Sequence, residues 1–329
     1  SKKKKIEIFI YICLIFRFIQ IVYYFLVVRS LGGSIKMLFG DAQWLRFAYL
    51  DYSANITSLF QKIIVNFINY IAEMGIVLSA LYSFKFKKFK FLILTMFFAL
   101  LSSIFSMSKM AFIIDAIFVL AVLSLYTYKS KIIPLIERQK LTKLLIKTGI
   151  FVITLAFVLF VIIAKQRGYQ NKQYSIEGID NIVIFEIIAY LVTPYMAFNN
   201  ILNWDIDYSY GVRTFYPFLK RFYIPLQDFG SINVGIEETT VYTMPGIFYV
   251  DFGFIGSLVC VFLFSILLNF SYKVMIEKRT FSSCITYCSF FVCLVLSFFT
   301  WMGRITFFWF FPVFSSIIFN FFISKKIKL

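Results

Sequence analysis

The chain contains few charged residues and no histidine at all. Charged residues make up only 15% of its 329 positions, whereas hydrophobic residues make up 61%, and the mean hydropathy is +0.85. A water-soluble domain cannot bury that much apolar surface, so an ordinary soluble protein is excluded. The sequence also lacks a Walker loop, a Rossmann glycine pattern and a nucleophile elbow, and nucleotide binding and serine hydrolysis therefore lose support.

Only weak candidates for a metal site are present. Cys284 and Cys288 are one helical turn apart, but no histidine can join them as a further ligand. Asp205 and Asp207 form a D-x-D pair that supplies too few oxygen ligands for a divalent ion. We therefore expect no metal and no other cofactor, and we expect the five cysteines to pack as small hydrophobic side chains. They are Cys13, Cys260, Cys284, Cys288 and Cys293.

Long apolar runs recur along the chain, and a hydrocarbon core needs about 20 such residues per helical span. Eight spans are predicted, at residues 6–28, 59–82, 90–107, 110–127, 148–165, 250–272, 283–301 and 305–323. The expected fold is all-α, a polytopic transmembrane helical bundle that forms a single integral membrane domain over residues 1–329.

The positions of the lysines predict the orientation of these spans. If the N-terminus is cytoplasmic, so are the lysine-rich segments 83–90, 128–147, 273–281 and the C-terminal tail. Together with the N-terminal run, they hold 20 Lys and Arg residues against three Glu residues, which accounts for the whole net charge of +17. This is the positive-inside pattern, so both termini are expected in the cytoplasm. The basic pI then reports orientation, and no nucleic-acid partner is expected.

The largest extracytoplasmic region is predicted at residues 166–249. Within it, residues 179–203 are apolar, but a ninth span there would move the later lysine clusters outside, so an interfacial or re-entrant helix is expected. Aromatic and basic residues alternate in the following loop, as in YSYGVRTFYPFLKRFY. This mixture suits sugar stacking with anion binding, and it equally suits a loop whose rings lie in the headgroup zone.

Several basic residues are predicted on the outer face: Arg29, Lys109, Arg167, Arg213, Arg221 and Arg304. Guanidinium groups bind phosphate oxygens bidentately and stay protonated beside hydrocarbon, so a lipid pyrophosphate is a suitable ligand. The alternative is that these side chains extend to the headgroups of membrane lipids.

Three charged residues are predicted deep within spans. Arg17 lies near the centre of the first span, where an unpaired charge costs several kcal/mol. Glu73 or Asp115 can pair with it across a helix interface. Three such groups are too few to form a chain of proton donors and acceptors across the membrane. A structural ion pair is therefore favoured over a proton relay.

Residues 244–273, MPGIFYVDFGFIGSLVCVFLFSILLNFSYK, contain an Asp-Phe-Gly-x-x-Gly element at the start of the predicted span, formed by Asp251, Phe252, Gly253 and Gly256. This stretch resembles the Wzy-type O-antigen and oligosaccharide repeat-unit polymerases. Further similarity lies in SMSKMAFIIDAIF, a tight outer turn in which the family commonly has Arg where Lys109 stands. Arg167-Gly168 opens the large loop in the family's order. Arg29 to Gly40 and Arg167 to Gly178 share an Arg-x10-Gly spacing of such outer loops.

The resemblance implies a metal-independent membrane glycosyltransferase in the bacterial cytoplasmic membrane. It would join polyprenyl-pyrophosphate-linked oligosaccharides into O-antigen or capsular polysaccharide at the outer leaflet. Membrane lipids and a chain-length-regulating co-polymerase would be its other partners. Family members usually have more than eight spans, so leading helices before residue 1 are expected.

The resemblance also directs the choice of site residues. The catalytic candidates are Arg167, Arg213, Arg304, Asp251 and Glu238, and the substrate-binding candidates are Lys109, Arg29, Arg221 and Glu237. The bases would hold the pyrophosphates and stabilise the leaving charge. Asp251, Glu237 or Glu238 would accept the proton of the acceptor hydroxyl, and the sequence does not choose among them.

Two other functions compete with the polymerase. An O-antigen ligase uses the same donor but usually depends on an outer-loop histidine, which this chain lacks. A lipid-linked oligosaccharide flippase or other transporter would line a central cavity with charges through the depth of the membrane. The predicted charges instead lie mainly outside the spans.

Overall fold

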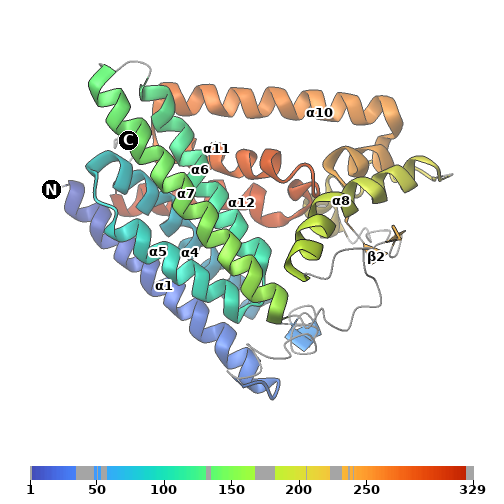
Figure 1. Cartoon of the computed structure of the whole chain (residues 1–329), viewed down its shortest axis with the longest axis horizontal. Helices are drawn as coiled ribbons and strands as arrows, with labels where there is room; N and C mark the ends of the chain where they lie inside the picture. Colours follow the sequence, from blue (N-terminus) through green and yellow to red (C-terminus); the bar gives the residue numbers. More distant parts are fainter. Residues whose placement is uncertain are drawn as a thin grey trace. The chain divides into compact units, whose positions relative to one another are not determined.

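The computed structural model describes residues 2–34, 48–49, 51–52, 58–130, 135–166, 182–204, 206–222, 232–235, 238–239 and 241–323. In this part of the chain the secondary structure is almost entirely helical, which confirms the all-α prediction (Figure 1). The elements are α1 (Lys2–Ser30), α4 (Leu59–Phe86), α5 (Lys90–Phe105), α6 (Lys109–Ser130), α7 (Leu135–Gln166), α8 (Ile182–Leu202), α9 (Tyr216–Leu219), the 3-10 helix η2 (Lys220–Phe222), β1 (Ile232–Asn233), β2 (Glu238–Thr239), α10 (Met244–Lys278), α11 (Phe281–Val295), the 3-10 helix η3 (Met302–Arg304) and α12 (Thr306–Ile323).

Five of the described helices are long and apolar enough to cross a membrane, namely α1, α4, α6, α10 and α12. The chain is therefore an α-helical, multi-pass membrane protein. Helices also occur at the other predicted spans, but α5, α11 and the apolar part of α7 are shorter than the lengths that define a full crossing. The number of eight spans stays a prediction.

Several helix boundaries differ from the predicted ones; α10, for example, begins at Met244 and ends at Lys278. Helix α7 already begins at Leu135, inside the lysine-rich segment predicted as a loop, because leucine, lysine, glutamate and glutamine are all good helix formers. Helix α11 ends at Val295, before the predicted end at residue 301. The Ser297 carbonyl accepts a hydrogen bond from the Met244 amide (2.8 Å), and this tertiary contact lies in the turn that follows the helix.

Contacts divide the chain into two compact units. Unit 1 comprises Ser1–Tyr169, Lys278–Cys288 and Phe314–Leu329, and unit 2 comprises Gln170–Glu277 and Ser289–Val313. Helices α11 and α12 therefore contribute residues to both units.

The core of unit 1 is built around α4, which packs against α1, α5 and α6 (Figure 1). Helices α1 and α4 approach each other closely at Gly75, where an added Cβ would lie 2.7 Å from the Cβ of Cys13. Small residues at such points let transmembrane helices approach closely. A substitution at Gly75 would push these two helices apart.

Helices α5 and α6 are joined by the tight turn that the sequence predicts. Met107 lies in the left-handed region with φ 52°. The Ser108 hydroxyl then accepts a hydrogen bond from the amide of Ala111 (3.4 Å) and caps the start of α6. Lys109 is consequently the first residue of a helix.

Unit 2 contains α8, which confirms a helix within residues 179–203. Its buried residues include five that are spaced four apart and form one face of the helix: Phe185, Ala189, Thr193, Ala197 and Ile201. Helix α8 packs against β1 and β2, and the Asn200 amide donates a hydrogen bond to the Asn233 carbonyl (3.1 Å). The position of α8 in the membrane interface stays a prediction.

Candidate functional site

The backbone of α10 is interrupted at Gly253, within the Asp-Phe-Gly element. This residue has φ 69° and ψ −172°, a conformation that is essentially restricted to glycine. An added Cβ would lie 3.1 Å from the Cζ atom of Tyr208. The absence of a side chain at Gly253 therefore leaves room for the Tyr208 ring.

Asp251, just before this interruption, is fully buried and binds a second segment of unit 2. Its Oδ1 accepts hydrogen bonds from the Ser209 hydroxyl and from the Arg213 amide (3.2 Å). Its Oδ2 accepts a hydrogen bond from the Thr214 amide (2.6 Å). The backbone adds two bonds, from the Ser209 amide to the Val250 carbonyl (3.1 Å) and from the Tyr210 amide to the Asp251 carbonyl (3.0 Å).

These contacts show how Asp251 acts in the fold. Both carboxylate oxygens are occupied by donors, and the side chain is not exposed. A general base instead needs a lone pair within reach of the hydroxyl proton that it removes. The geometry therefore makes Asp251 an anchor for the turn at residues 209–214, and its role as the base stays a prediction.

Arg213 is held in place at both of its ends. The amide is bound by Asp251, and Nη1 of the guanidinium donates a hydrogen bond to the Tyr242 hydroxyl (2.6 Å). The side chain is buried. An arginine with so little freedom is already ordered before any anion binds, which lowers the entropic cost of binding.

The segment that follows Arg213 packs against the turn that carries Arg304. Trp301 Nε1 donates a hydrogen bond to the Thr214 carbonyl (3.2 Å), although the two residues are 87 positions apart. Helix α9 packs against η3, which contains Arg304. Unit 2 thus brings together the segment that contains Arg213 and the segment that contains Arg304. Both arginines are among those predicted to bind phosphate.

Aromatic rings fix this arrangement. The Trp301 ring packs against Phe248, with a centroid distance of 5.1 Å. The Phe218 ring meets Trp309 edge to face at 5.4 Å, and Trp309 Nε1 donates a hydrogen bond to the Gly303 carbonyl (2.6 Å). The turn with Arg304 is therefore held from both sides, while the Arg304 side chain itself is half-buried.

Two buried hydroxyls lie close to these residues in the sequence. The Oγ1 atoms of Thr214 and Thr300 have no hydrogen-bond partner among the described residues. Buried hydroxyls are nearly always hydrogen-bonded, so such atoms point to a further partner.

The remaining site predictions have different outcomes. Arg29 is exposed in the last turn of α1, whereas Lys109 is fully buried at the start of α6, and both belong to unit 1. Arg221 lies in η2 and Glu238 in β2. Arg167 and Glu237, as well as Asp205 of the D-x-D pair, lie outside the described residues.

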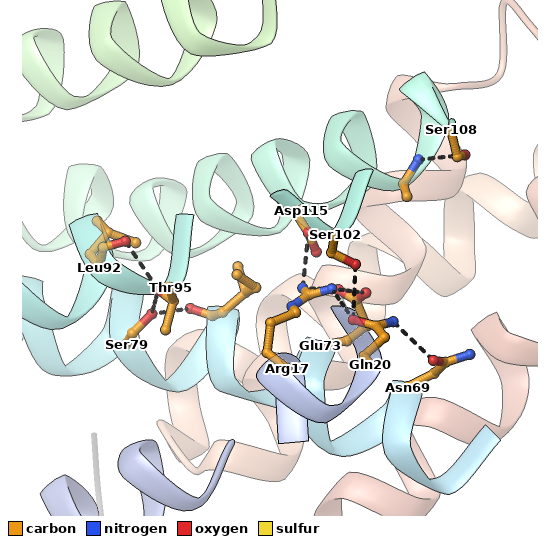
Figure 2. Close-up of polar contacts among 12 residues, drawn as sticks. Arg17, Gln20, Asn69, Glu73, Ser79, Leu92, Thr95, Ser102, Ser108 and Asp115 are labelled. Carbon is orange, nitrogen blue, oxygen red and sulfur yellow. Dashed lines mark hydrogen bonds and ion pairs between the residues drawn. The ribbon is translucent and has the colours of Figure 1, made fainter. Parts of the chain in front are cut away.

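A second polar cluster lies in unit 1 around Arg17 (Figure 2). Its guanidinium makes a bidentate pair with Glu73, with Nη1 to Oε1 at 3.0 Å and Nη2 to Oε2 at 3.2 Å. Nη2 also binds Asp115 Oδ2 at 2.9 Å. The predicted pairing of Arg17 is confirmed, and it involves both acids together.

Neutral side chains surround this ion pair. Gln20 Oε1 accepts hydrogen bonds from Arg17 (2.9 Å) and from Ser102 (3.1 Å), and Gln20 Nε2 donates to Asn69 (2.9 Å). The sequence analysis missed these three residues. Gln20 and Asn69 could have been found, because they lie three and four positions from Arg17 and Glu73 on the same helix faces.

No group of three or more His, Cys, Asp or Glu residues suited to a metal ion occurs in the part of the chain that the structure describes. Cys284 and Cys288 are both buried.

Comparison with protein-family models, with curated proteins and with solved structures finds no match to this chain. The function is therefore argued from the sites themselves.

Proposed function

We propose that this protein is a membrane glycosyltransferase that joins polyprenyl-pyrophosphate-linked oligosaccharide repeat units at the outer face of the bacterial cytoplasmic membrane. The observation that carries the proposal is the packing of the Arg213 segment against the Arg304 segment in unit 2. The surplus of Lys and Arg in the predicted cytoplasmic segments supports the assignment of this region to the outer face.

A pair of arginines suits a pyrophosphate. Each guanidinium can donate two parallel hydrogen bonds to phosphate oxygens and keeps its charge at all physiological pH values. Arg213 is fixed by Tyr242 and by the anchor at Asp251, which supports a role in stabilising charge that develops on a leaving group. Preorganised donors of this kind need no rearrangement when the bond breaks.

Exposed aromatic rings in the same segment support a sugar ligand. Tyr208, Tyr210 and Phe215 each expose more than 40% of their surface. Such rings pack against the apolar faces of sugars, and the hydroxyls of Tyr208 and Tyr210 remain hydrated. The combination of rings and arginines suits a molecule that is a glycan at one end and a pyrophosphate at the other.

In the proposed reaction, the hydroxyl of the acceptor sugar attacks the anomeric carbon of the donor glycan. The new bond joins that oxygen to the anomeric carbon, and the bond from the same carbon to the pyrophosphate oxygen breaks. The leaving polyprenyl pyrophosphate keeps the electron pair, and Arg213 and Arg304 bind its charge. The hydroxyl proton passes to a base, for which Glu237 and Glu238 are the candidates because Asp251 is occupied.

The test is to incubate purified protein with a polyprenyl-pyrophosphate repeat unit and separate the products by size. We expect a ladder of lengthening glycans. Unchanged substrate would refute the proposal. Transfer only to a lipid A-core acceptor would show that the protein is a ligase and not a polymerase. Replacement of Arg213 or Arg304 by Gln should abolish the ladder, while Lys273→Gln, which removes a charge that is 73% exposed, should leave it intact.

Orientation is tested separately by labelling single cysteines in whole cells. A cysteine placed at Tyr210, which is 85% exposed, should react with a membrane-impermeant maleimide added from outside. A cysteine at Lys273 should react only after the cells are opened. The reverse pattern would place the proposed site in the wrong compartment.

A further inference from the structure

The cluster around Arg17 contains two carboxyl groups but only one guanidinium. All three side chains are largely removed from solvent, with 4% of Arg17, 12% of Glu73 and 1% of Asp115 exposed. They come from α1, α4 and α6, each of which is long and apolar enough to cross a membrane. If both acids were ionised, the cluster would carry a net charge of minus one.

Among the residues that the structure describes, no second Lys or Arg binds the two acids. The electrostatic partners of Asp115 are Arg17 and Glu73, and those of Arg17 are the two acids and Tyr24. Helix α5 contributes the neutral Ser102, and α1 contributes the neutral Gln20. The Cys13 thiol near Arg17 is also buried, and a thiol adds no positive charge.

The two acids also bind the same atom of Arg17. Nη2 donates to Glu73 Oε2 at 3.2 Å and to Asp115 Oδ2 at 2.9 Å, which brings the two carboxyl groups together. Two ionised carboxylates this close repel each other, whereas a proton on one of them removes the repulsion and can be donated to the other. In addition, Asp115 Oδ1 is buried and accepts no hydrogen bond from an N–H or O–H group of the described residues. A proton between the acids supplies that donor.

We propose that Glu73 and Asp115 bind one proton between them and that this proton makes the cluster with Arg17 electrically neutral. An isolated negative charge among apolar helices is expensive, whereas a neutral, hydrogen-bonded cluster is tolerated. The proton belongs to the pair, as in other closely spaced carboxyl groups. Figure 2 shows the guanidinium and the two acids converging at one point.

The site therefore has a defined ligand, a proton, and a defined effect on the fold. Loss of the proton leaves two carboxylates to repel each other where α4 and α6 meet α1. Binding of the proton thus stabilises the packing of three helices. This inference concerns unit 1 alone and does not depend on the glycan-transfer proposal.

The test uses infrared spectroscopy of the purified full chain in phospholipid nanodiscs at neutral pH. A protonated carboxyl group gives a carbonyl stretching band that shifts in heavy water, and an ionised one does not. We expect this band in the unaltered protein. It should be lost in both Glu73→Gln and Asp115→Asn, because each variant leaves one carboxylate matched to the one guanidinium.

Glu277→Gln is the control, since that side chain is 59% exposed and lies outside the cluster. The band should persist in this variant. Absence of the band from the unaltered protein, or its survival in either Glu73→Gln or Asp115→Asn, would overturn the proposal.

A second measurement does not depend on spectroscopy. Arg17→Met alone removes the balancing charge and should lower the yield of folded protein by on the order of tenfold or more. Adding Glu73→Gln and Asp115→Asn to Arg17→Met removes both acids and should restore the yield. If the triple variant stays as poor as Arg17→Met, charge balance does not govern the cluster and the proposal fails.

Discussion

The anchor at Asp251 allows a quantitative prediction for Asp251→Ala. The substitution removes the acceptor of three hydrogen bonds, those from the Ser209 hydroxyl and from the amides of Arg213 and Thr214. The hydroxyl can turn to another partner, but the two buried amides cannot. An unsatisfied buried donor costs about 1–3 kcal/mol, so the turn should lose about 2–6 kcal/mol of stability.

Hydrogen exchange measured by mass spectrometry reports this loss directly. Every 1.4 kcal/mol of local stability changes the exchange rate by roughly tenfold, so a loss of about 3 kcal/mol speeds exchange by more than about a hundredfold. The effect should appear in peptides that cover residues 206–222. Asp207→Ala is the matched control, because Asp207 lies in the same segment but is exposed.

Unchanged exchange in Asp251→Ala would refute the anchoring role. Asp251→Asn separates anchoring from proton transfer, since the amide keeps one acceptor oxygen and the shape of the side chain. If glycan transfer disappears in Asp251→Asn while exchange stays slow, Asp251 is the base after all. The anchoring role predicts that transfer and protection fall together.

Three further substitutions test the same region. Gly253→Ala should destabilise the protein by about 1–3 kcal/mol in thermal unfolding, because alanine cannot easily adopt this backbone conformation; Gly149→Ala, whose Cβ meets nothing within 4 Å, should not. Trp301→Phe removes the donor to the Thr214 carbonyl and should cost about 1–2 kcal/mol in the same assay. Arg213→Lys keeps the charge but loses the planar fork, so glycan transfer should fall at least about tenfold in the ladder assay.

The helices and the pairing of Arg17 could be predicted because a membrane tolerates neither unpaired backbone groups nor unpaired charges. An apolar run of sufficient length has few alternatives to a helix in hydrocarbon. A guanidinium in the middle of such a run needs an acid, and away from the ends of the predicted spans the only acids are Glu73 and Asp115. The sequence left the choice between them open, and the structure shows that both are used.

The anchor in unit 2 could not be predicted in this way. Asp251 binds backbone amides 37 and 38 positions earlier in the chain, and any residue type can present an amide. The burial of Lys109 could not be predicted either, because a lysine in a turn is normally solvated. The early end of α11 accompanies a hydrogen bond from Met244 to Ser297, a contact that no local pattern marks.

The ion cluster in unit 1 also has a consequence for biosynthesis. Glu73 is synthesised 56 positions after Arg17, and Asp115 is synthesised 98 positions after it. At a synthesis rate of about 5–20 residues per second, helix α1 waits roughly 3–11 seconds for its first acid. During that interval the guanidinium depends on water, lipid phosphate or the insertion machinery for stabilisation. Helix α1 should therefore settle into the bilayer only after α4 has emerged from the ribosome.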